Sequence, residues 1–524
     1  MRKRTGTGAW VLALLVAGLY ATLAAGADDP GSGTANQSVS SRSAATLAIR
    51  RALQAALQKA QQPDAASQSD AALREVIDSP VFNTLDTSEQ HLALAASAGV
   101  ALQLDQPQRA QQLATRATDL PEQSIDDWRL RLVAATRVGD ARDQVNCVAT
   151  IAHRWGRALS EVSDQLILRA ASDAQKAGLE DERLGMLALL YEIRWKPSSG
   201  REPSALWREL SLLQLNKNQL DQAMDVASHI TDPYDVIVMR ADNRYKPLFK
   251  SEFVPHDVRK VAEDSLQQSR AAMEAAPHSL SRVVHLASVL LRLMRDREVL
   301  SLTDEVIRQV EPANLPHVIN GGVSPYTDLD SQYAWLLGVR AEALADLGRF
   351  DEAVTTQQRS IQWPGNKDLI SHHINLAEVL CELDRPQEAL AVLPQPDKAS
   401  PYGRMQIELN RLTAAVEEGD VAEADGALDY LRQHQADSHR ALQKALVIAG
   451  RVDEGAALLL ARLSDSALRA EALTDVQDYL EPSAPPRVLQ WREQFKKLRE
   501  RRDIRAAIDR VGRIDRYPVN YASF

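Results

Sequence analysis

Apolar residues recur at intervals of three and four along most of the chain beyond about residue 45. Leu337, Ala341 and Leu344 form one such stripe, and the segment from Leu376 to Leu383 carries another. This period places the apolar side chains on one face of an α-helix. Alternating runs of Val, Ile and Thr are absent, and aromatic residues make up only 5% of the chain. Because strands are enriched in those residue types, the pattern predicts an all-α fold.

A short sequence motif recurs between the helical stripes. It begins with a residue that favours a turn, continues through mixed positions that usually include an acid, and ends in Ala or Gly. A Gly or Asp can adopt the left-handed conformation that ends one helix, and an acid is favoured in the first turn of the next. The spacing of 31 to 36 residues therefore predicts repeated helix-turn-helix units. The copies are Gly348–Ala353, Asp384–Ala389, Gly419–Ala424 and Gly450–Gly455, with further ones from Asp105, Gly139 and Asn218.

This arrangement resembles the tetratricopeptide repeat (TPR), a helix-turn-helix unit of about 34 residues. The resemblance is strongest from Ala334 to Gln395. Arg340 and Gln357 depart from it, since they stand where apolar residues are usual. In two other copies Trp128 and Trp207 fill the large aromatic position of the first helix. Signature positions of the copy that begins at Ala334 are filled by Leu337, Ala341, Leu344, Gly348, Phe350, Ala353, Ser360 and Pro364.

The resemblance implies a right-handed superhelical solenoid of TPR-like helix-turn-helix repeats with one long concave wall. The repeat rhythm breaks between residues 231 and 332, which predicts irregular middle helices, and a capping helix is expected at the C-terminal end. The predicted domains are a signal peptide at 1–27, a flexible linker at 28–44, divergent repeats at 45–230, an irregular helical region at 231–332 with a loop at 312–330, repeats at 333–480, a basic helix at 487–516 and a tail at 517–524.

The first 27 residues have the pattern of a targeting signal. Arg2, Lys3 and Arg4 are followed by the apolar run Trp10–Tyr20 and by the small residues Ala25–Gly26–Ala27. A basic start, a short apolar stretch and a small-residue cleavage site are typical of a secretory signal peptide. We therefore expect a periplasmic or secreted protein. The alternative is an uncleaved segment that anchors the chain in a membrane.

Composition and motifs exclude several classes of chemistry. The only two cysteines, Cys147 and Cys381, exclude a disulfide scaffold and a multi-cysteine metal site. The net charge of -10 argues against general nucleic-acid binding. Nucleophile-elbow, phosphate-loop, dinucleotide and zinc-peptidase motifs are absent, and the adjacent His372 and His373 would point in different directions on a helix. The sequence therefore predicts a non-catalytic protein with no cofactor and no metal.

The stretch from 487 to 516 is strongly basic. It contains eleven Lys and Arg residues and five acids, together with a sparse apolar stripe. One interpretation is a capping helix for the last repeat, because a repeat array needs an end piece with a polar outer face. The other is peripheral contact with an anionic membrane or an acidic partner, which a basic amphipathic helix also suits. We favour the cap.

In the TPR family, ligands lie along the first helix of each repeat, facing the concave wall. Members that bind chaperone tails use Lys and Asn there to clamp a terminal carboxylate. Here Gly338 and Ile374 occupy the usual Lys positions, which disfavours that ligand. The acidic wall favours a basic or polar segment of a protein partner, or else remains a solvated surface. The candidate partner-binding residues are Trp335, Glu342, Asp346, Asn375, Glu378 and Glu382.

Two functions of different class fit these patterns. The first is an exported TPR scaffold that mediates protein–protein interaction in a cell-envelope assembly, secretion or polysaccharide-export process. The alternative is an envelope enzyme, or a subunit of one, with a site in the irregular 231–330 region. That site would need polar groups that converge on a pocket, for example around Asp242, Arg244, Tyr245 and His256.

Overall fold

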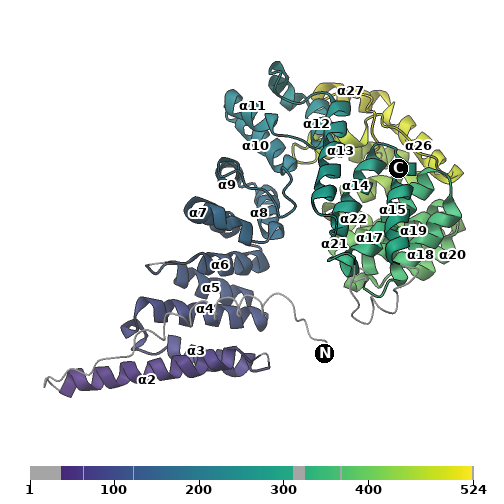
Figure 1. Cartoon of the computed structure of the whole chain (residues 1–524). Helices are drawn as coiled ribbons and strands as arrows, with labels where there is room; N and C mark the ends of the chain where they lie inside the picture. The colour runs from purple at the N-terminus through teal and green to yellow at the C-terminus, as the bar shows by residue number, and fades with distance from the viewer. Residues whose placement is uncertain (1–36, 63, 122, 311–324, 366–368, 522–524) are drawn as a thin grey trace. The chain divides into compact units, whose positions relative to one another are not determined.

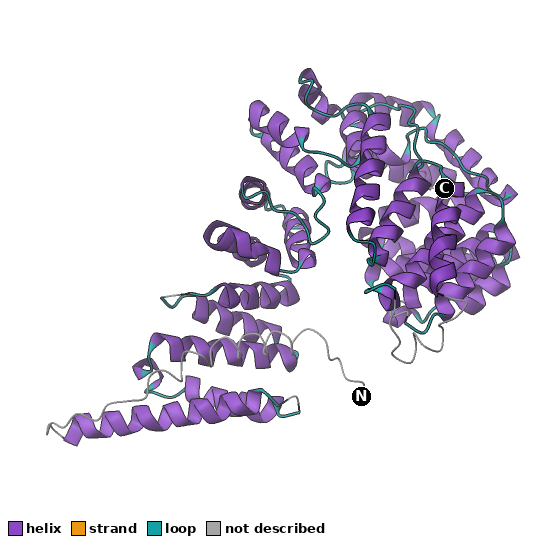
Figure 2. Cartoon of the chain, in the orientation of Figure 1, coloured by secondary structure: helices purple, strands orange, loops and turns teal. Residues whose placement is uncertain are grey.

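The computed structural model describes residues 37–521 except 63, 122, 311–324 and 366–368 (Figure 1). This part of the chain is helical throughout, and only two isolated β-bridges interrupt the helices and loops (Figure 2). The all-α prediction is confirmed. The predicted signal peptide lies outside the described residues, and helix α2 already begins at Gln37, inside the predicted linker. No described helix has the length and apolar character that a membrane span requires.

The chain divides into two compact units, residues 1–214 and 215–524. In unit 1, consecutive helices pack against one another, and those between residues 37 and 138 share an apolar core that runs from Ile49 to Ala134. The helices of unit 1 are α2 (Gln37–Ala60), α3 (Ala66–Ile77), α4 (Thr87–Gln103), α5 (Pro107–Thr118), α6 (Ile125–Val138), α7 (Ala141–Trp155), α8 (Asp164–Lys176), α9 (Glu180–Glu192) and α10 (Ser204–Asn216).

Unit 2 contains the repeats with the clearest sequence signal. The predicted boundary between residues 230 and 231 falls inside this unit. Its helices are α11 (Leu220–Ser228), α12 (Pro233–Ala241), α13 (Val258–Ala275), α14 (Leu280–Arg292), α15 (Asp296–Val310), α17 (Leu329–Asp346), α18 (Phe350–Gln362), α19 (Leu369–Glu382), α20 (Pro386–Val392), α21 (Pro401–Glu418), α22 (Val421–Gln433), α23 (His439–Ile448), α24 (Val452–Ser464), α25 (Arg469–Asp475), α26 (Pro486–Arg499) and α27 (Arg502–Val511).

Left-handed residues mark the tight turns between paired helices. After such a residue, the next backbone N–H donates to the carbonyl five residues earlier, as Arg349 does to Leu344 at 2.8 Å. This bond satisfies a carbonyl at the end of the first helix, and the left-handed conformation makes it possible. All seven predicted turn residues have positive φ: Asp105, Gly139, Asn218, Gly348, Asp384, Gly419 and Gly450.

Small residues then let the paired helices approach. Ala353 and Ala389, each five positions beyond a left-handed residue, are 1% and 0% exposed. Ala353 belongs to the core that Leu344 forms with helix α14. Each hairpin therefore buries its apolar face against the neighbouring hairpins, as expected of a repeat array.

The middle of the chain combines a regular hairpin with irregular structure. Helices α14 and α15 form a further hairpin, whose turn residue Met294 has φ +56°. This hairpin packs against α17 through a core that includes Leu286, Val299 and Leu344. Around α12 the structure is irregular, and a 3-10 helix, Asn243–Lys250, follows it. Most of the predicted loop at 312–330 lies outside the described residues.

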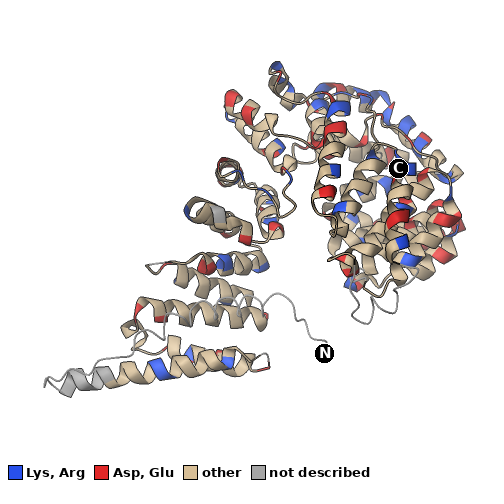
Figure 3. Cartoon of the chain, in the orientation of Figure 1, with Lys and Arg blue, Asp and Glu red and all other residues tan. Residues whose placement is uncertain are grey.

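The C-terminal region returns across unit 2. The predicted single helix at 487–516 is two helices, α26 and α27, because Arg501 between them is extended, with ψ 141°. Lys and Arg recur along both helices (Figure 3). The apolar side of α27, with Ile504 and Ile508, packs against Leu459 and Leu463 of α24. This contact confirms that the C-terminal helix caps the last repeat. We call residues 478–521 the return segment.

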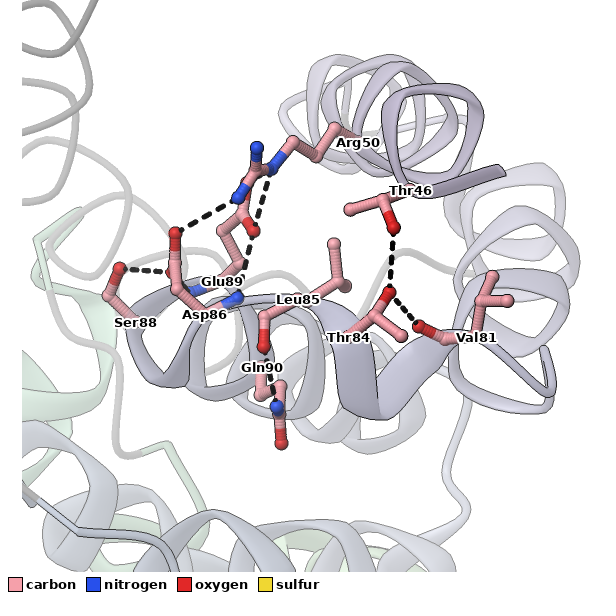
Figure 4. Close-up of polar contacts among 9 residues, drawn as sticks. All are labelled: Thr46, Arg50, Val81, Thr84, Leu85, Asp86, Ser88, Glu89 and Gln90. Carbon is pink, nitrogen blue, oxygen red and sulfur yellow. Dashed lines mark hydrogen bonds and ion pairs between the residues drawn. The ribbon is translucent and has the colours of Figure 1, made fainter. Parts of the chain in front are cut away.

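Helix α2 of unit 1 is fixed to α4 by a polar cluster (Figure 4). Asp86 and Glu89 form a capping box, in which each side chain accepts the backbone N–H of the other. Arg50 of α2 contacts both carboxylates, with 2.7 Å from its Nε to Glu89 Oε1. Thr46 of α2 and Thr84 also join through their hydroxyl groups at 3.0 Å.

Candidate functional site

Helices α15, α17 and α19 of unit 2 bring five carboxylates close enough to influence one another. We call this group the acidic wall. Pairs spaced by four positions lie on the same face of their helix, which explains the two acids on α17 and the two on α19. The fifth acid is the first residue of α15. The acidic wall consists of Asp296, Glu342, Asp346, Glu378 and Glu382.

Asp346, on α17, has a strongly raised pKa. Loss of hydration in its partly buried position, and then the charges of Glu342 and Asp296, raise its pKa to about 7. Arg292 and Arg492 oppose this shift without cancelling it. Near neutral pH the Asp346 carboxyl is therefore divided between its neutral and charged forms, and a nearby change in charge will move that balance.

The pKa values of Glu382 and Glu342 are raised as well. Burial, and then the charge of Glu378, raises the pKa of Glu382, while Lys444 and Arg492 act in the opposite direction. Glu342 is exposed as a whole residue, but the protein atoms around its carboxyl group limit the hydration of that group and so raise its pKa. Lys444 also forms a 3.6 Å ion pair with Glu378.

Two oxygens of the acidic wall lack a hydrogen-bond partner within the described part of the chain. These are Oδ1 of Asp296, a residue that is only 6% exposed, and Oδ2 of Asp346. Burial raises the pKa of Asp296 as well. A buried polar atom without a partner is costly, so both positions would gain from a cationic donor.

The return segment covers part of the acidic wall. Its residues Val488 and Trp491, on α26, line a narrow gap of about 30 Å³ together with Glu378 and Glu382. Just before α26, the Ser483 N–H donates to the Asp346 carbonyl at 3.2 Å. The chain therefore supplies its own cover for one side of this wall.

The structure brings four of the six predicted partner-binding residues together. Glu342, Asp346, Glu378 and Glu382 belong to the acidic wall. Of the other two, Trp335 packs its ring against His372 with centroids 4.6 Å apart, and Asn375 is exposed on α19. Sequence reasoning missed Asp296, which lies in the region predicted to be irregular, and the covering role of α26.

The residues suggested for an enzyme site serve local structure. The Asp242 carboxylate is fully buried. It accepts a hydrogen bond from the Arg244 backbone N–H, and its Oδ2 forms an ion pair with Arg244 Nη2 at 2.6 Å. Tyr245 is 1% exposed. His256 is exposed and lines a different cavity from the acidic wall. These four side chains do not converge on one pocket.

The cysteines and the adjacent histidines occupy separate surroundings. Cys147 and Cys381 are free and buried, and burial raises the pKa of the Cys147 thiol well above its usual range. His372 is fully buried, whereas His373 is half-buried and its Nδ1 lies 2.7 Å from the carbonyl of Val392. Both thiols therefore act as small core residues.

Comparison with known proteins adds solved structures of low similarity. No protein-family model and no curated protein matches the sequence. A chain in the crystal structure of the APC/C hetero-tetramer Cut9-Hcn1 is 13% identical, with 88% of this chain and 85% of that chain covered and a TM-score of 0.28. A chain in the structure of Naa15/Naa10 bound to HypK-THB is 12% identical, with 96% of this chain and 80% of that chain covered and a TM-score of 0.28. The crystal structure of yeast Tom70 is 12% identical, with 80% of this chain and 98% of that chain covered and a TM-score of 0.23. With scores this low, the fold assignment rests on the helical hairpins themselves.

Proposed function

We propose that this protein is an exported, non-catalytic scaffold that binds a basic or polar segment of another protein at the acidic wall. Its setting would be a cell-envelope assembly, secretion or polysaccharide-export process. The proposal of export rests on the signal-peptide pattern of residues 1–27. The proposal of binding rests on the fold and on the chemistry of unit 2.

The observation that carries the proposal is the unbalanced charge of the acidic wall. Five carboxylates influence one another there, and three cationic groups, Arg292, Lys444 and Arg492, act on them. Two of the carboxylate oxygens have no donor among the described residues. At the accessible carboxylates Glu342 and Glu378, a Lys or Arg side chain of a partner would supply donors and charge together, and hydrogen bonds between charged groups are the stronger kind.

The return segment limits where such a partner can bind. Its helix α26 buries Val488, Trp491, Phe495 and Leu498, all below 9% exposure. Each buried apolar side chain of this size contributes about 1.5–3 kcal/mol relative to an exposed one. Helix α26 is therefore a fixed part of unit 2. We expect the partner to bind beside it, over the accessible residues Glu342, Asn375 and Glu378.

Site-specific photocrosslinking tests the position of this contact. A photoreactive amino acid would replace Asn375 in the full chain, and cross-linked proteins would be identified by mass spectrometry. We expect a defined partner whose cross-linked peptide carries Lys or Arg, and we expect Glu342→Gln with Glu378→Gln to abolish the product. The matched control is Glu423→Gln with Asp425→Asn, which removes two exposed acids from α22. Equal loss in both variants, or a partner segment that is acidic, would contradict the proposal.

Export requires its own test. The full chain would be expressed in a bacterium, cells would be fractionated, and the N-terminus of the protein would be sequenced. A periplasmic or secreted protein that begins near Asp28 supports cleavage after Ala27. A full-length chain in the membrane fraction would instead support the uncleaved anchor, and a full-length chain in the cytoplasm would contradict export.

A further inference from the structure

A second cavity in unit 2 has the opposite character to the acidic wall. It has a volume of about 730 Å³ and lies where the end of α12, the start of α13 and the return segment meet. Three of its lining residues are arginines from these three separate segments. The residues that matter for its chemistry are Arg240, His256, Arg259, Arg516 and Tyr517.

Backbone pairing within the return segment fixes one side of this arginine pocket. The Tyr517 N–H donates to the Asp478 carbonyl at 2.8 Å, and the Leu480 N–H donates to the Val519 carbonyl at 3.0 Å. The opposite side is held because Arg240 Nη1 donates to the His256 carbonyl at 3.0 Å. A pocket built in this way presents its side chains without having to fold around a ligand, which favours binding.

The pocket carries more positive charge than its own acids neutralise. Arg240 and the neighbouring Arg513 share one carboxylate, that of Asp515, at 3.1 and 3.2 Å. Among the described residues that line the pocket the one acid is Asp257, whose carboxylate accepts the backbone N–H groups of Arg259 and Lys260.

Arg259 and Arg516 remain available. Both are exposed, and neither forms an ion pair with an acid in the part of the chain that the structure describes. Their positions on α13 and on the return segment place two unused guanidinium groups at one cavity. Each guanidinium is always charged and presents several donors in a fixed plane.

We propose that this arginine pocket binds a phosphate-type group. A planar carboxylate is satisfied by a single guanidinium fork. Guanidinium donors that arrive from two separate segments, α13 and the return segment, suit the tetrahedral oxygens of a phosphate, which point in several directions. Free phosphate esters and the headgroups of anionic phospholipids share this chemistry, and the experiment below distinguishes them. The inference is independent of the partner proposed for the acidic wall.

Calorimetry would test the pocket by measuring the binding of glycerol 3-phosphate to the full chain. The measurement is made at about 0.15 M salt, because nonspecific surface attraction is screened under those conditions. The test variant is Arg259→Gln with Arg516→Gln. The control is Arg502→Gln with Arg510→Gln, which removes two exposed arginines of α27 that line no part of the pocket. We expect at least about tenfold weaker binding in the test variant and unchanged binding in the control, because the test variant loses the charge-assisted hydrogen bonds of two guanidinium groups.

Two further arms complete the test. Acetate at the same concentration reports on a carboxylate ligand, and vesicles of phosphatidylcholine with or without phosphatidylglycerol report on a lipid source. Binding of glycerol 3-phosphate supports a soluble source, and binding to vesicles only when they contain phosphatidylglycerol supports a lipid source, provided that the test variant loses it. The proposal is overturned if neither phosphate compound binds, if acetate binds as tightly, or if the control variant loses binding equally.

Discussion

Gly512 lies directly against the carbonyl of Ala241, so that the return segment contacts the end of α12. A Cβ atom added at Gly512 would lie 2.1 Å from that carbonyl oxygen and 2.8 Å from Leu473 Cδ2. The next residue, Arg513, donates its N–H to the same carbonyl at 3.0 Å. Helix α25 also packs against α12. The ends of α12 and α27 are therefore held together by a contact that only glycine permits.

We predict that Gly512→Ala destabilises unit 2 by about 2–3 kcal/mol, because the return segment has to move away from α12. Hydrogen exchange of the α12 amides and urea unfolding would measure this effect. Gly426→Ala is the matched control, since an added Cβ there meets nothing within 4 Å. Alanine is also the better helix former, so the control is expected to be neutral or stabilising by up to about 1 kcal/mol. Equal stability of the two variants would show that the α12 contact is dispensable.

Asp346 makes the stability of unit 2 depend on pH. Its folded-state pKa of about 7 lies above the ordinary value of 3.8. The folded state therefore binds the proton more tightly, and stability falls as the pH rises from about 4 through 7. We predict that Asp346→Asn is more stable than the native chain by about 1–2 kcal/mol at pH 8, a figure reduced for partial exposure. Near pH 5 the two proteins should differ little.

Urea unfolding at pH 5, 6, 7 and 8 would check the Asp346 prediction. The Asp346→Asn variant should retain part of the pH dependence of the native chain's stability, because burial also raises the pKa of Glu382. Asp425→Asn, which removes an exposed acid from α22, is the control. An Asp346→Asn variant that is less stable than the native chain at pH 8 would show that its charge is needed.

Asp86 should give the stability of unit 1 the opposite pH dependence. Burial alone would raise its pKa, but the Glu89 N–H, the Ser88 hydroxyl and Arg50 lower it overall (Figure 4). A lowered pKa gives stability that is present above the ordinary value and is lost as the pH falls below about 4. We predict that Asp86→Ala costs about 1–2 kcal/mol at pH 7, as loss of a helix cap does.

Thermal unfolding of the full chain, followed through the hydrogen exchange of α4, would measure the effect of Asp86→Ala. Asp86→Asn is the informative comparison, because Asn caps a helix nearly as well as Asp but carries no charge. It should keep most of the stability at pH 7 and lose the acid dependence. If the two variants are equally destabilised, the ion pair with Arg50 contributes more than the cap.

The hairpins with Gly, Asp or Asn at the turn could be predicted, since these residues reach the left-handed conformation at little cost. Met294 gave no such signal, because a left-handed Met is held there by the packing of its hairpin against α17. In the acidic wall, residues spaced by four on one helix could be grouped from the sequence. The cover by α26 could not, because the Ser483–Asp346 contact joins positions far apart in the chain and has no local pattern.

Binding at the acidic wall should depend on pH through Asp346. A cationic segment beside this carboxyl would favour its charged form and so release a proton, because its pKa in the unbound protein is about 7. Affinity for a Lys- and Arg-containing peptide from the cross-linked partner should therefore rise between pH 6 and pH 8. Fluorescence anisotropy at constant ionic strength would measure this change.

Asp346→Asn should remove most of that pH dependence while leaving Glu342 and Glu378 to bind the peptide. Because the variant is neutral at every pH, its affinity should resemble that of the native chain at pH 6 and stay below it at pH 8. A peptide in which Gln replaces the basic residues should bind weakly at both pH values. If the native chain binds the basic peptide more tightly at pH 6 than at pH 8, the charged form of Asp346 does not contribute to recognition.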